Sequence, residues 1–410
     1  MPAKAKWTFA VYMAGDNTLS SAGDKDLAEM RAIGSTKDVH VVAEFDNAGP
    51  FGTRRFHIER GGASERVENL GETDSGDPQV LLNFVSWVKS EYPADHYALI
   101  LWNHGGGWAP LDLDRLAQKV GAKDYSDREA TERAATPIAR TFFRTTLQKI
   151  FSLPTARERA ICCDDGTGHS LDTVELGNVL KQTHAILGQP LDLLGMDACL
   201  MSNLEVAYQV RKDVRYVVAS EESEPNAGWP YDAVLKKLTA APDTEAKDLA
   251  AHIVKSYVKS YVDVGFGGAV TQAGLDLSRM DDLQGPLDAL ADALIQAMPA
   301  ARTKIWTAQV GSAHFYNSTL WDIAHFGELL PKGWRAPAVR DAAKAVRAAL
   351  KQGAGKFIIS EAHHGPGVSR CRGLTIYLIT QLTRISPYYA NLAFAKERRW
   401  LDLLKAYHGV

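Results

Sequence analysis

The sequence predicts an α/β fold in which helices cover both faces of a mostly parallel β-sheet, followed by a helix-rich C-terminal extension. Short apolar runs alternate with amphipathic helical stretches through the first half of the chain, which is the pattern of parallel βαβ units. The chain has 410 residues, of which 46% are hydrophobic and 23% charged. That length and composition suit one large or two ordinary globular domains.

Strand-like and helix-like segments alternate up to about residue 220. Apolar runs too short for a free helix are predicted as buried strands, and longer stretches with helical spacing are predicted as helices. The predicted strands are Phe9–Met13, His40–Phe45, Tyr97–Trp102, a run that begins at Leu193, and Tyr216–Ser220, with an exposed hairpin at Thr53–Arg60 and Glu65–Leu70. The predicted helices are Leu19–Gly34 and Gln79–Glu91.

After about Leu238 the helical pattern dominates, and we place a domain boundary there. The core is predicted to cover residues 1–238 and a helix-rich C-terminal domain residues 239–410. Two strand-like runs interrupt the second part, so it forms either a separate domain or an extension of the first sheet. Its predicted helices are Thr244–Val262, Met280–Met298 and Ala336–Gln352, and its strands are Ala269–Leu277 and Gly373–Ile379.

Residues 109–163 break the alternation and are predicted as an inserted lid. The segment mixes charges of both signs and contains little continuous apolar sequence. Long connections inside a compact domain are commonly functional, and a solvated helical decoration is the competing interpretation. Its arginines are Arg115, Arg128, Arg133, Arg140, Arg144, Arg157 and Arg159.

The composition excludes several classes of function. A formal net charge of -3 gives no electrostatic attraction to nucleic acid or to an anionic membrane surface, and no apolar run approaches the length of a membrane span. The four cysteines are too few for a disulfide framework and lack zinc-ribbon spacing. The basic, apolar amino terminus fits a first core strand better than a signal peptide. The expected compartment is cytoplasmic, or secreted or periplasmic if a leader was removed.

One cysteine occupies a position where α/β proteins place reactive groups. Cys199 follows the apolar run Leu193–Met196, at the carboxyl end of a predicted strand, where open parallel sheets bind ligands. A helix is expected to start near Ser202 and Asn203, which can cap it. Because a helix amino terminus lowers the pKa of a nearby thiol, this position predicts a nucleophile. A buried structural cysteine is the alternative.

A histidine opens a glycine run at the end of another predicted strand. His104 is followed by Gly105–Gly107, and glycines let main chain approach a ligand that a Cβ would exclude. A thiol nucleophile needs a base, and acyl transfer needs N–H donors aimed at the developing oxyanion. His104 is the candidate base, with the main-chain N–H groups of Gly105 and Cys199 as candidate donors. A structural histidine is the alternative.

Other hydrolase mechanisms lack a required motif. A serine hydrolase with a His-Gly-Gly-Gly loop also needs Gly-x-Ser-x-Gly, and residues 168–172 lack the final glycine. The Asp-Ser-Gly triplet at residues 74–76 has no second copy to complete an aspartic dyad. The histidine pair at residues 363–364 lacks the spacing of zinc ligands. A thiol with a histidine base is the arrangement that remains.

Three stretches together resemble the clostripain family of cysteine peptidases, in the family's order. The loop Ser220–Tyr231 and the late strands near residues 275–278 and 373–377 also fit. The three stretches are Phe9–Asn17 (FAVYMAGDN), Leu99–Trp108 (LILWNHGGGW) and Met196–Met201 (MDACLM).

The resemblance implies a caspase-like α/β fold and a cysteine endopeptidase with a Cys–His dyad. Cys199 would be the nucleophile and His104 the general acid and base, with Gly105 and Cys199 forming the oxyanion hole. Family members cut after Arg or Lys, using acids at the base of the first specificity pocket, and Asp197 matches one such position. Basic-specific relatives often carry a further acid where this chain has Asn226-Ala227. A peptidase with non-basic specificity and a catalytically silent caspase-like binding protein are therefore the alternatives.

The resemblance also bears on activation and cofactors. Relatives are often cleaved between the histidine and cysteine strands, so self-cleavage is expected within residues 109–163. No cofactor is expected for the chemistry. Some relatives need calcium, for which Asp164 and Asp165 are candidate ligands, although no complete calcium loop is present. The expected partners are protein or peptide substrates, and the expected state is a monomer.

Overall fold

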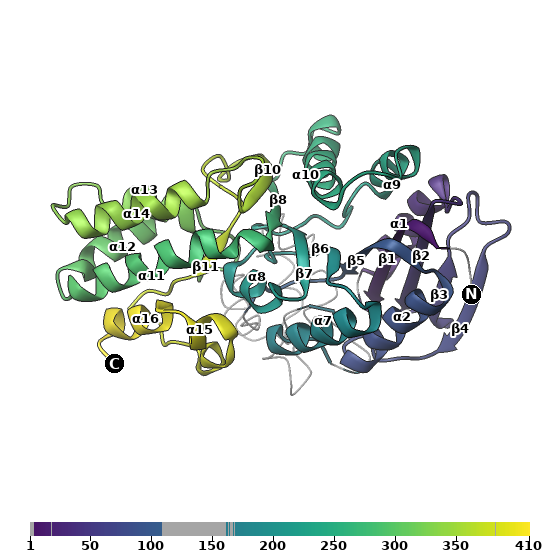
Figure 1. Cartoon of the computed structure of the whole chain (residues 1–410), viewed down its shortest axis with the longest axis horizontal. Helices are drawn as coiled ribbons and strands as arrows, with labels where there is room; N and C mark the ends of the chain where they lie inside the picture. The colour runs from purple at the N-terminus through teal and green to yellow at the C-terminus, as the bar shows by residue number, and fades with distance from the viewer. Residues whose placement is uncertain are drawn as a thin grey trace, which may run out of the picture.

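A nine-stranded sheet runs through the molecule in the order β10-β8-β7-β6-β5-β1-β2-β3-β4 (Figure 1). The computed structural model describes residues 4–17, 19–108, 161, 162, 164, 167, 169–381 and 383–410. The central strands are parallel: β2 (Val39–Asn47), β1 (Ala5–Gly15), β5 (Ala94–Trp102), β6 (Leu191–Asp197) and β7 (Val214–Ala219). The edge strands are antiparallel: β3 (Gly52–His57) and β4 (Arg66–Gly71) at one edge, β8 (Val270–Asp276) and β10 (Ile358–His364) at the other.

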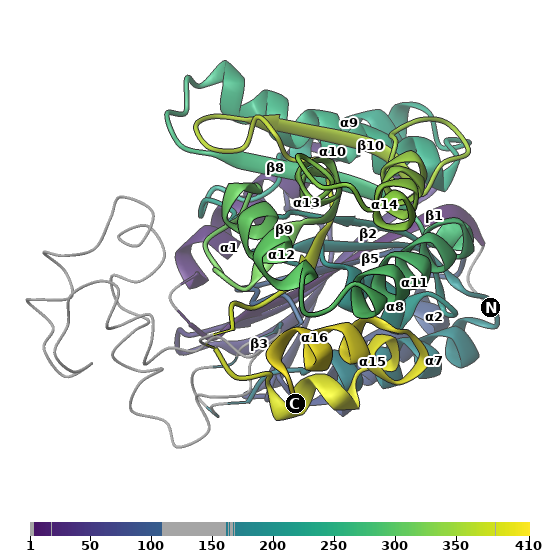
Figure 2. The same cartoon turned by 90° about the vertical axis from the view of Figure 1, so that its left-hand side faces the viewer.

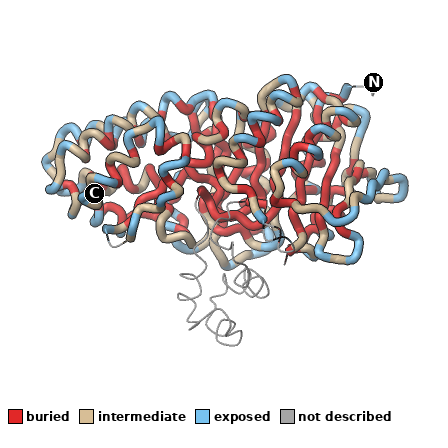
Figure 3. The backbone as a smooth tube through the Cα atoms, turned by 90° about the horizontal axis from the view of Figure 1, so that it is seen from below, coloured by how far each residue is buried: buried red, intermediate tan, exposed pale blue. Residues whose placement is uncertain are grey.

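Helices cover both faces of this sheet, as predicted. Alternate residues of a strand point to opposite faces, and in β1 Phe9 and Val11 pack into one apolar cluster whereas Ala10 and Tyr12 pack into the other. The central strands are therefore buried on both sides (Figure 3). The helices on one face are α1 (Ser20–Ile33), α9 (Tyr231–Ala240) and α10 (Ala246–Asp263); those on the other are α2 (Pro78–Glu91), α7 (Thr173–Leu187) and α8 (Leu204–Val210).

The C-terminal half supplies the last strands of the sheet and a group of helices at one end of the molecule (Figures 1 and 2). The sequence left open whether this half extends the first sheet, and β8 and β10 do extend it. The domain boundary predicted at residue 238 falls within α9. The division into two domains stays a prediction. The remaining elements are η1 (Leu277–Arg279), α11 (Met280–Gln296), α12 (Ala301–Gly311), α13 (Ile323–Leu329), α14 (Pro337–Ala349), η2 (Pro387–Asn391), α15 (Ala393–Glu397), α16 (Trp400–His408) and a small antiparallel sheet of β9 (Leu320–Asp322) and β11 (Thr375–Tyr377).

The predicted elements correspond to observed ones within a few residues at each end, and the predicted exposed hairpin is the antiparallel pair β3 and β4. The proposed lid and its arginines lie almost entirely outside the described residues. In the part of the chain that the structure describes, no helix combines the length and apolar character needed to cross a membrane.

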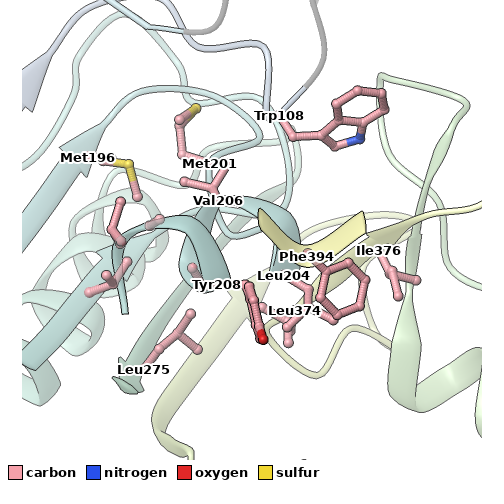
Figure 4. Packing of buried hydrophobic residues seen from close by; sticks show 14 of the residues in the cluster. Trp108, Met196, Met201, Leu204, Val206, Tyr208, Leu275, Leu374, Ile376 and Phe394 are labelled. Carbon is pink, nitrogen blue, oxygen red and sulfur yellow. The ribbon is translucent and has the colours of Figure 1, made fainter. Parts of the chain in front are cut away.

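A buried carboxyl group ties α8 to the C-terminal segment. Glu205, in the first turn of α8, accepts hydrogen bonds from the Tyr389 hydroxyl at 2.8 Å and from the Tyr377 N–H at 3.1 Å. Burial raises the pKa of Glu205 to about 7, because its charged form loses hydration. Figure 4 shows the apolar side chains of this region, where Leu204 and Tyr208 of α8 lie close to Leu374 and Phe394 of the C-terminal segment.

This shift predicts a pH-dependent stability. The folded chain binds the Glu205 proton more tightly than the unfolded chain, so the associated stability is present at low pH and is lost as the pH rises through about 7. Glu205→Gln keeps an acceptor for both bonds but cannot ionise. We expect the Tm of this variant, relative to the parent, to increase from about pH 5 to about pH 8 in thermal unfolding. Glu68→Gln on exposed β4 is the control, and a difference independent of pH would contradict the prediction.

Candidate active site

The carboxyl ends of β5 and β6 bring the two predicted reactive residues into one cleft. The strands are parallel, with Trp102 opposite Asp197, and His104 and Cys199 each lie two residues beyond that pair. The Asn103 N–H donates to the Asp197 carbonyl at 3.3 Å, which extends the pairing past the strand ends. The described residues lining the cleft are Leu19, Trp102, Asn103, His104, Asp197, Ala198, Cys199, Glu224, Pro225, Asn226 and Gly228.

Gly105 lies directly against the main chain of Cys199. A Cβ built on Gly105 would lie 2.2 Å from the Cys199 carbonyl oxygen and 2.9 Å from its nitrogen, so a side chain cannot fit without a shift of the backbone. Gly105 also forms an isolated antiparallel bridge with Ile161. The two residues predicted to form the oxyanion hole are therefore adjacent.

Cys199 is buried beneath the loop that follows β7. Its Sγ accepts a hydrogen bond from the Glu224 N–H at 3.0 Å and lies 3.7 Å from the Glu224 carbonyl oxygen. Burial raises the pKa of the thiol well above its ordinary value, and the Glu224 carboxylate raises it further, while the N–H bond lowers it. Leu200, with φ of 65°, turns the chain immediately after the cysteine in a conformation that is costly for a side-chain-bearing residue.

The predicted effect of a helix amino terminus on the thiol is wrong. Helix α8 begins only at Leu204 and is capped by Asn203, whose side chain accepts from the N–H groups of Glu205 and Val206. The dipole effect acts within the first turn of a helix, and Cys199 precedes that turn. Its position at a junction between a strand and a helix is nevertheless as predicted.

Three buried carboxyl groups gather at one side of the cleft. Asp197 Oδ2 accepts from the Tyr231 hydroxyl at 2.8 Å and from the Trp229 N–H at 3.2 Å. Asp26 Oδ2, from α1, accepts from Trp102 Nε1 at 2.6 Å.

Glu224 Oε1 accepts from Gln272 Nε2 at 3.2 Å. A Cβ built on Gly228 would lie 3.1 Å from Asp197 Oδ2 and 3.4 Å from Asp26 Oδ2. Both carboxyl groups therefore approach Gly228, whose backbone lies in the left-handed region.

In the described part of the chain, the only positive charge noted near Asp26 is that of Lys25, which lowers the pKa of its carboxyl group less than burial raises it. Burial, followed by repulsion from Asp197, raises the pKa of Asp26 to about 9. The same two causes raise the pKa of Glu224 well above its usual range, and burial raises that of Asp197. No lysine or arginine among the described residues forms an ion pair with any of the three. Burial therefore opposes ionisation of all three carboxyl groups of this acid cluster.

The sequence pointed to Asp197 but assigned no role to Asp26 or Glu224. Asp26 lies on an amphipathic helix far from the cysteine in sequence, and no local pattern distinguishes it from a solvated charge. Glu224 lies in a loop that matched the family as a whole. Among the described residues, no group of three or more His, Cys, Asp or Glu side chains is placed to hold a metal ion. Asp165, one of the two candidate calcium ligands, lies outside the described residues.

The contact between Gly105 and Cys199 predicts opposite effects for two glycine substitutions. Gly105→Ala forces the nucleophile loop to move, and we expect a loss of about 1–3 kcal/mol in the free energy of unfolding. Gly285→Ala is the matched control, because a Cβ at this position in α11 meets no atom within 4 Å. It should stabilise the protein by about 0.4–1 kcal/mol. Urea unfolding measures both, and equal effects of the two substitutions would refute the contact.

Comparisons with known proteins identify the family of the chain. The model of the clostripain family, peptidase C11, matches residues 11–131 and 152–407. Clostripain from Hathewaya histolytica is 26% identical over 274 residues, which make up 59% of this chain and 44% of that relative. The matched region thus spans less than half the length of that relative.

Two solved structures of C11 proteases share the fold over nearly the whole chain. One is a secreted cysteine protease from Bacteroides thetaiotaomicron bound to an irreversible peptide inhibitor, with a TM-score of 0.61, 18% identity, and coverage of 98% of this chain and 99% of the other. The second is an inactive zymogen from Parabacteroides distasonis, with a TM-score of 0.63, 19% identity, and coverage of 97% and 99%. The family model covers most of the chain, and the predicted signatures lie within it except for Phe9 and Ala10 at the start of the first. This chain therefore belongs to the clostripain family, peptidase family C11.

Proposed function

We propose that this chain hydrolyses peptide bonds through a Cys199–His104 dyad. The observation that carries the proposal is the placement of both residues two positions beyond the Trp102–Asp197 pair, in one cleft. Cys199 Sγ attacks the scissile carbonyl carbon while its proton passes to His104. The carbonyl oxygen becomes an oxyanion, which the main-chain N–H groups of Gly105 and Cys199 stabilise.

The intermediate then collapses to a thioester. The C–N bond breaks and His104 gives its proton to the leaving amine. Water adds to the thioester with His104 as base, the C–S bond breaks, and the carboxylic acid product leaves with the thiol restored. The raised pKa of Cys199 supports a role for a base in the first step, because a neutral thiol must lose its proton as it attacks.

The acid cluster supports a preference for arginine or lysine before the scissile bond. Asp197 was assigned to this pocket by resemblance, and Asp26 and Glu224 add carboxyl groups where Asn226-Ala227 supply none. A guanidinium or ammonium group would replace the protons that the buried carboxyl groups hold and would form charge-assisted hydrogen bonds with them. The proposed specificity therefore rests on three acids instead of one.

We further propose activation by cleavage within residues 109–160. The described residues on either side of that range are anchored in the core. Trp108 packs edge-to-face on Tyr377 and Tyr389, with ring centroids 4.5 and 4.8 Å apart, and Ile161 bridges to Gly105 and to Leu171. A break between these anchors would leave both new ends attached beside His104. One of the similar structures is an inactive zymogen, which fits such a step.

The proposed chemistry uses only groups of the chain. Asp164 Oδ2 accepts a hydrogen bond from the Ser75 N–H at 3.0 Å, and Asp164 Oδ1 accepts one from the Thr167 N–H at 2.9 Å. Both oxygens of this carboxyl group therefore already bind main-chain N–H groups. Calcium binding there and a monomeric state stay predictions. One similar protease is secreted, which favours the secreted or periplasmic alternative for this chain.

The dyad predicts the behaviour of two variants. Cys199→Ala and His104→Ala should each lower kcat/KM for a peptide reporter with arginine before the scissile bond by more than about 10³-fold. Both should retain the Tm of the parent within a few degrees. Intact-mass measurement should find the parent cleaved within residues 109–160 and Cys199→Ala uncut. Cys371→Ala is the control. Full activity in Cys199→Ala would overturn the dyad, and a parent that cleaves no reporter would favour the silent binding-protein alternative.

If the acid cluster binds the substrate cation, removing one of its carboxylates should reduce the selectivity for arginine. Asp197→Asn and Asp26→Asn should each reduce kcat/KM for the arginine reporter by about 10- to 100-fold, because each removes a charge-assisted hydrogen bond. A reporter with citrulline, which has the shape of arginine without its charge, should be affected much less. Asp243→Asn, at an exposed site, is the control. If all variants kept the same ratio of the two reporters, the specificity would reside elsewhere.

A further inference from the structure

A second cavity lies away from the catalytic cleft, among the C-terminal helices. It has a volume of about 260 Å³ and is bounded by α13, the end of α14, β10 and residues 370–372, which Figure 1 shows at the opposite end of the sheet from β4. That size is at the low end for small-molecule sites and well above the space of a single water. Its lining residues are Ala324, His325, Glu328, Arg347, Leu350, Lys351, Gln352, Glu361, Arg370 and Arg372.

Cations outnumber acids on the wall of this cavity. Four side chains carry positive charge, and the two carboxylates present are already engaged. Glu361 lies 2.6 Å from His363 Nδ1, and Glu328 lies 3.3 Å from Lys332. The four cations are Arg347, Lys351, Arg370 and Arg372, all on exposed residues.

Neighbouring carboxylates do not neutralise all of these cations. Arg347 approaches Glu328 only to 3.9 Å, and neither Lys351 nor Arg370 has an ion-pair partner among the described residues. Asp322 is buried behind the cavity, but its carboxylate accepts at 2.6 Å from the main-chain N–H groups of both His325 and Arg372. Arg372 Nη1 also donates to the Cys371 carbonyl oxygen, so this guanidinium is partly engaged, and its remaining N–H groups and those of Arg370 have no carboxylate partner among the described residues.

One donor in the cavity has its orientation fixed by the fold. His325 Nδ1 accepts a hydrogen bond from the Ala313 N–H at 2.9 Å, so the neutral ring carries its proton on Nε2. Burial, aided by Arg370 and Arg372, lowers the pKa of this histidine. The wall thus presents an N–H donor beside several cationic donors, and within the lining only Glu328 and Glu361 are acidic.

We propose that this cavity binds a multivalent oxyanion, a small molecule bearing two or more phosphate or carboxylate groups. Guanidinium groups match the paired oxygens of such anions and bind them through two parallel hydrogen bonds. A single charge would leave most of the four cations unpaired, so several anionic groups are required. The ligand would join α13, the end of α14 and residues 370–372, and its binding would stabilise the folded chain by mass action.

The test uses the full chain and inorganic triphosphate as the probe, at constant ionic strength and in buffers freed of divalent metals by an immobilised chelating resin, so that no soluble polycarboxylate competes for the cavity. We expect triphosphate to raise the midpoint of thermal unfolding in a concentration-dependent way. The double variant Arg370→Gln, Arg372→Gln should lose this shift and bind at least about tenfold more weakly in calorimetry. Lys236→Gln with Lys237→Gln, an equal loss of charge on exposed positions of α9, should behave as the parent.

Citrate forms the second arm. Binding of triphosphate alone would assign the site to phosphates, and binding of citrate alone would assign it to carboxylates. If the first double variant fails to fold, Arg347→Gln with Lys351→Gln removes two charges of the same lining from the end of α14 and should weaken binding in the same way. The proposal is overturned if neither anion shifts the parent, or if the cavity variants and the α9 control respond alike.

Discussion

The parallel register of β5 and β6 is the constraint on which the proposed active site depends. Trp102 lies opposite Asp197, so two residues of further chain bring His104 and Cys199 to the same height above the sheet. A slip of one residue would turn every side chain of one strand to the other face. The buried apolar side chains on both faces of β6 prevent that slip, because either shift would exchange residues between two packed clusters.

The candidate site places several ionisable groups where water is excluded. Burial raises the pKa of the Cys199 thiol and of the nearby carboxyl groups of Asp26, Asp197 and Glu224, since a charge is costly where water is excluded. A substrate cation entering the pocket would compensate the carboxylates that form there. The site is thus arranged so that its charged state is most favourable when the proposed substrate is present, and the Glu224 backbone holds the thiol close to that pocket.

Much of this architecture could be predicted from sequence because it rests on local patterns. Alternating apolar runs indicated the central strands, and a cysteine and a histidine at strand ends indicated the cleft. The antiparallel addition of β8 and β10 to the sheet could not be predicted, because strand pairing across long stretches of chain leaves no local signal. Asp26 was missed for the same reason: only the packing of α1 against the strand ends brings it to Asp197. The sequence indicated a helix cap at Ser202 or Asn203, and Asn203 is the cap. The expected effect on the thiol fails because Cys199 lies before the first turn of the helix, outside the short reach of its dipole.

One labelling experiment can identify the nucleophile and measure the preference of the pocket for a positive charge. The protein is treated with a peptidyl chloromethyl ketone that carries arginine and, in parallel, with its uncharged citrulline analogue, and the adduct is mapped by mass spectrometry while the rate is followed. We expect a single adduct, on Cys199, that forms much faster with the arginine reagent than with the citrulline reagent. Labelling of Cys162 or Cys371 instead, or equal rates with the two reagents, would contradict this expectation.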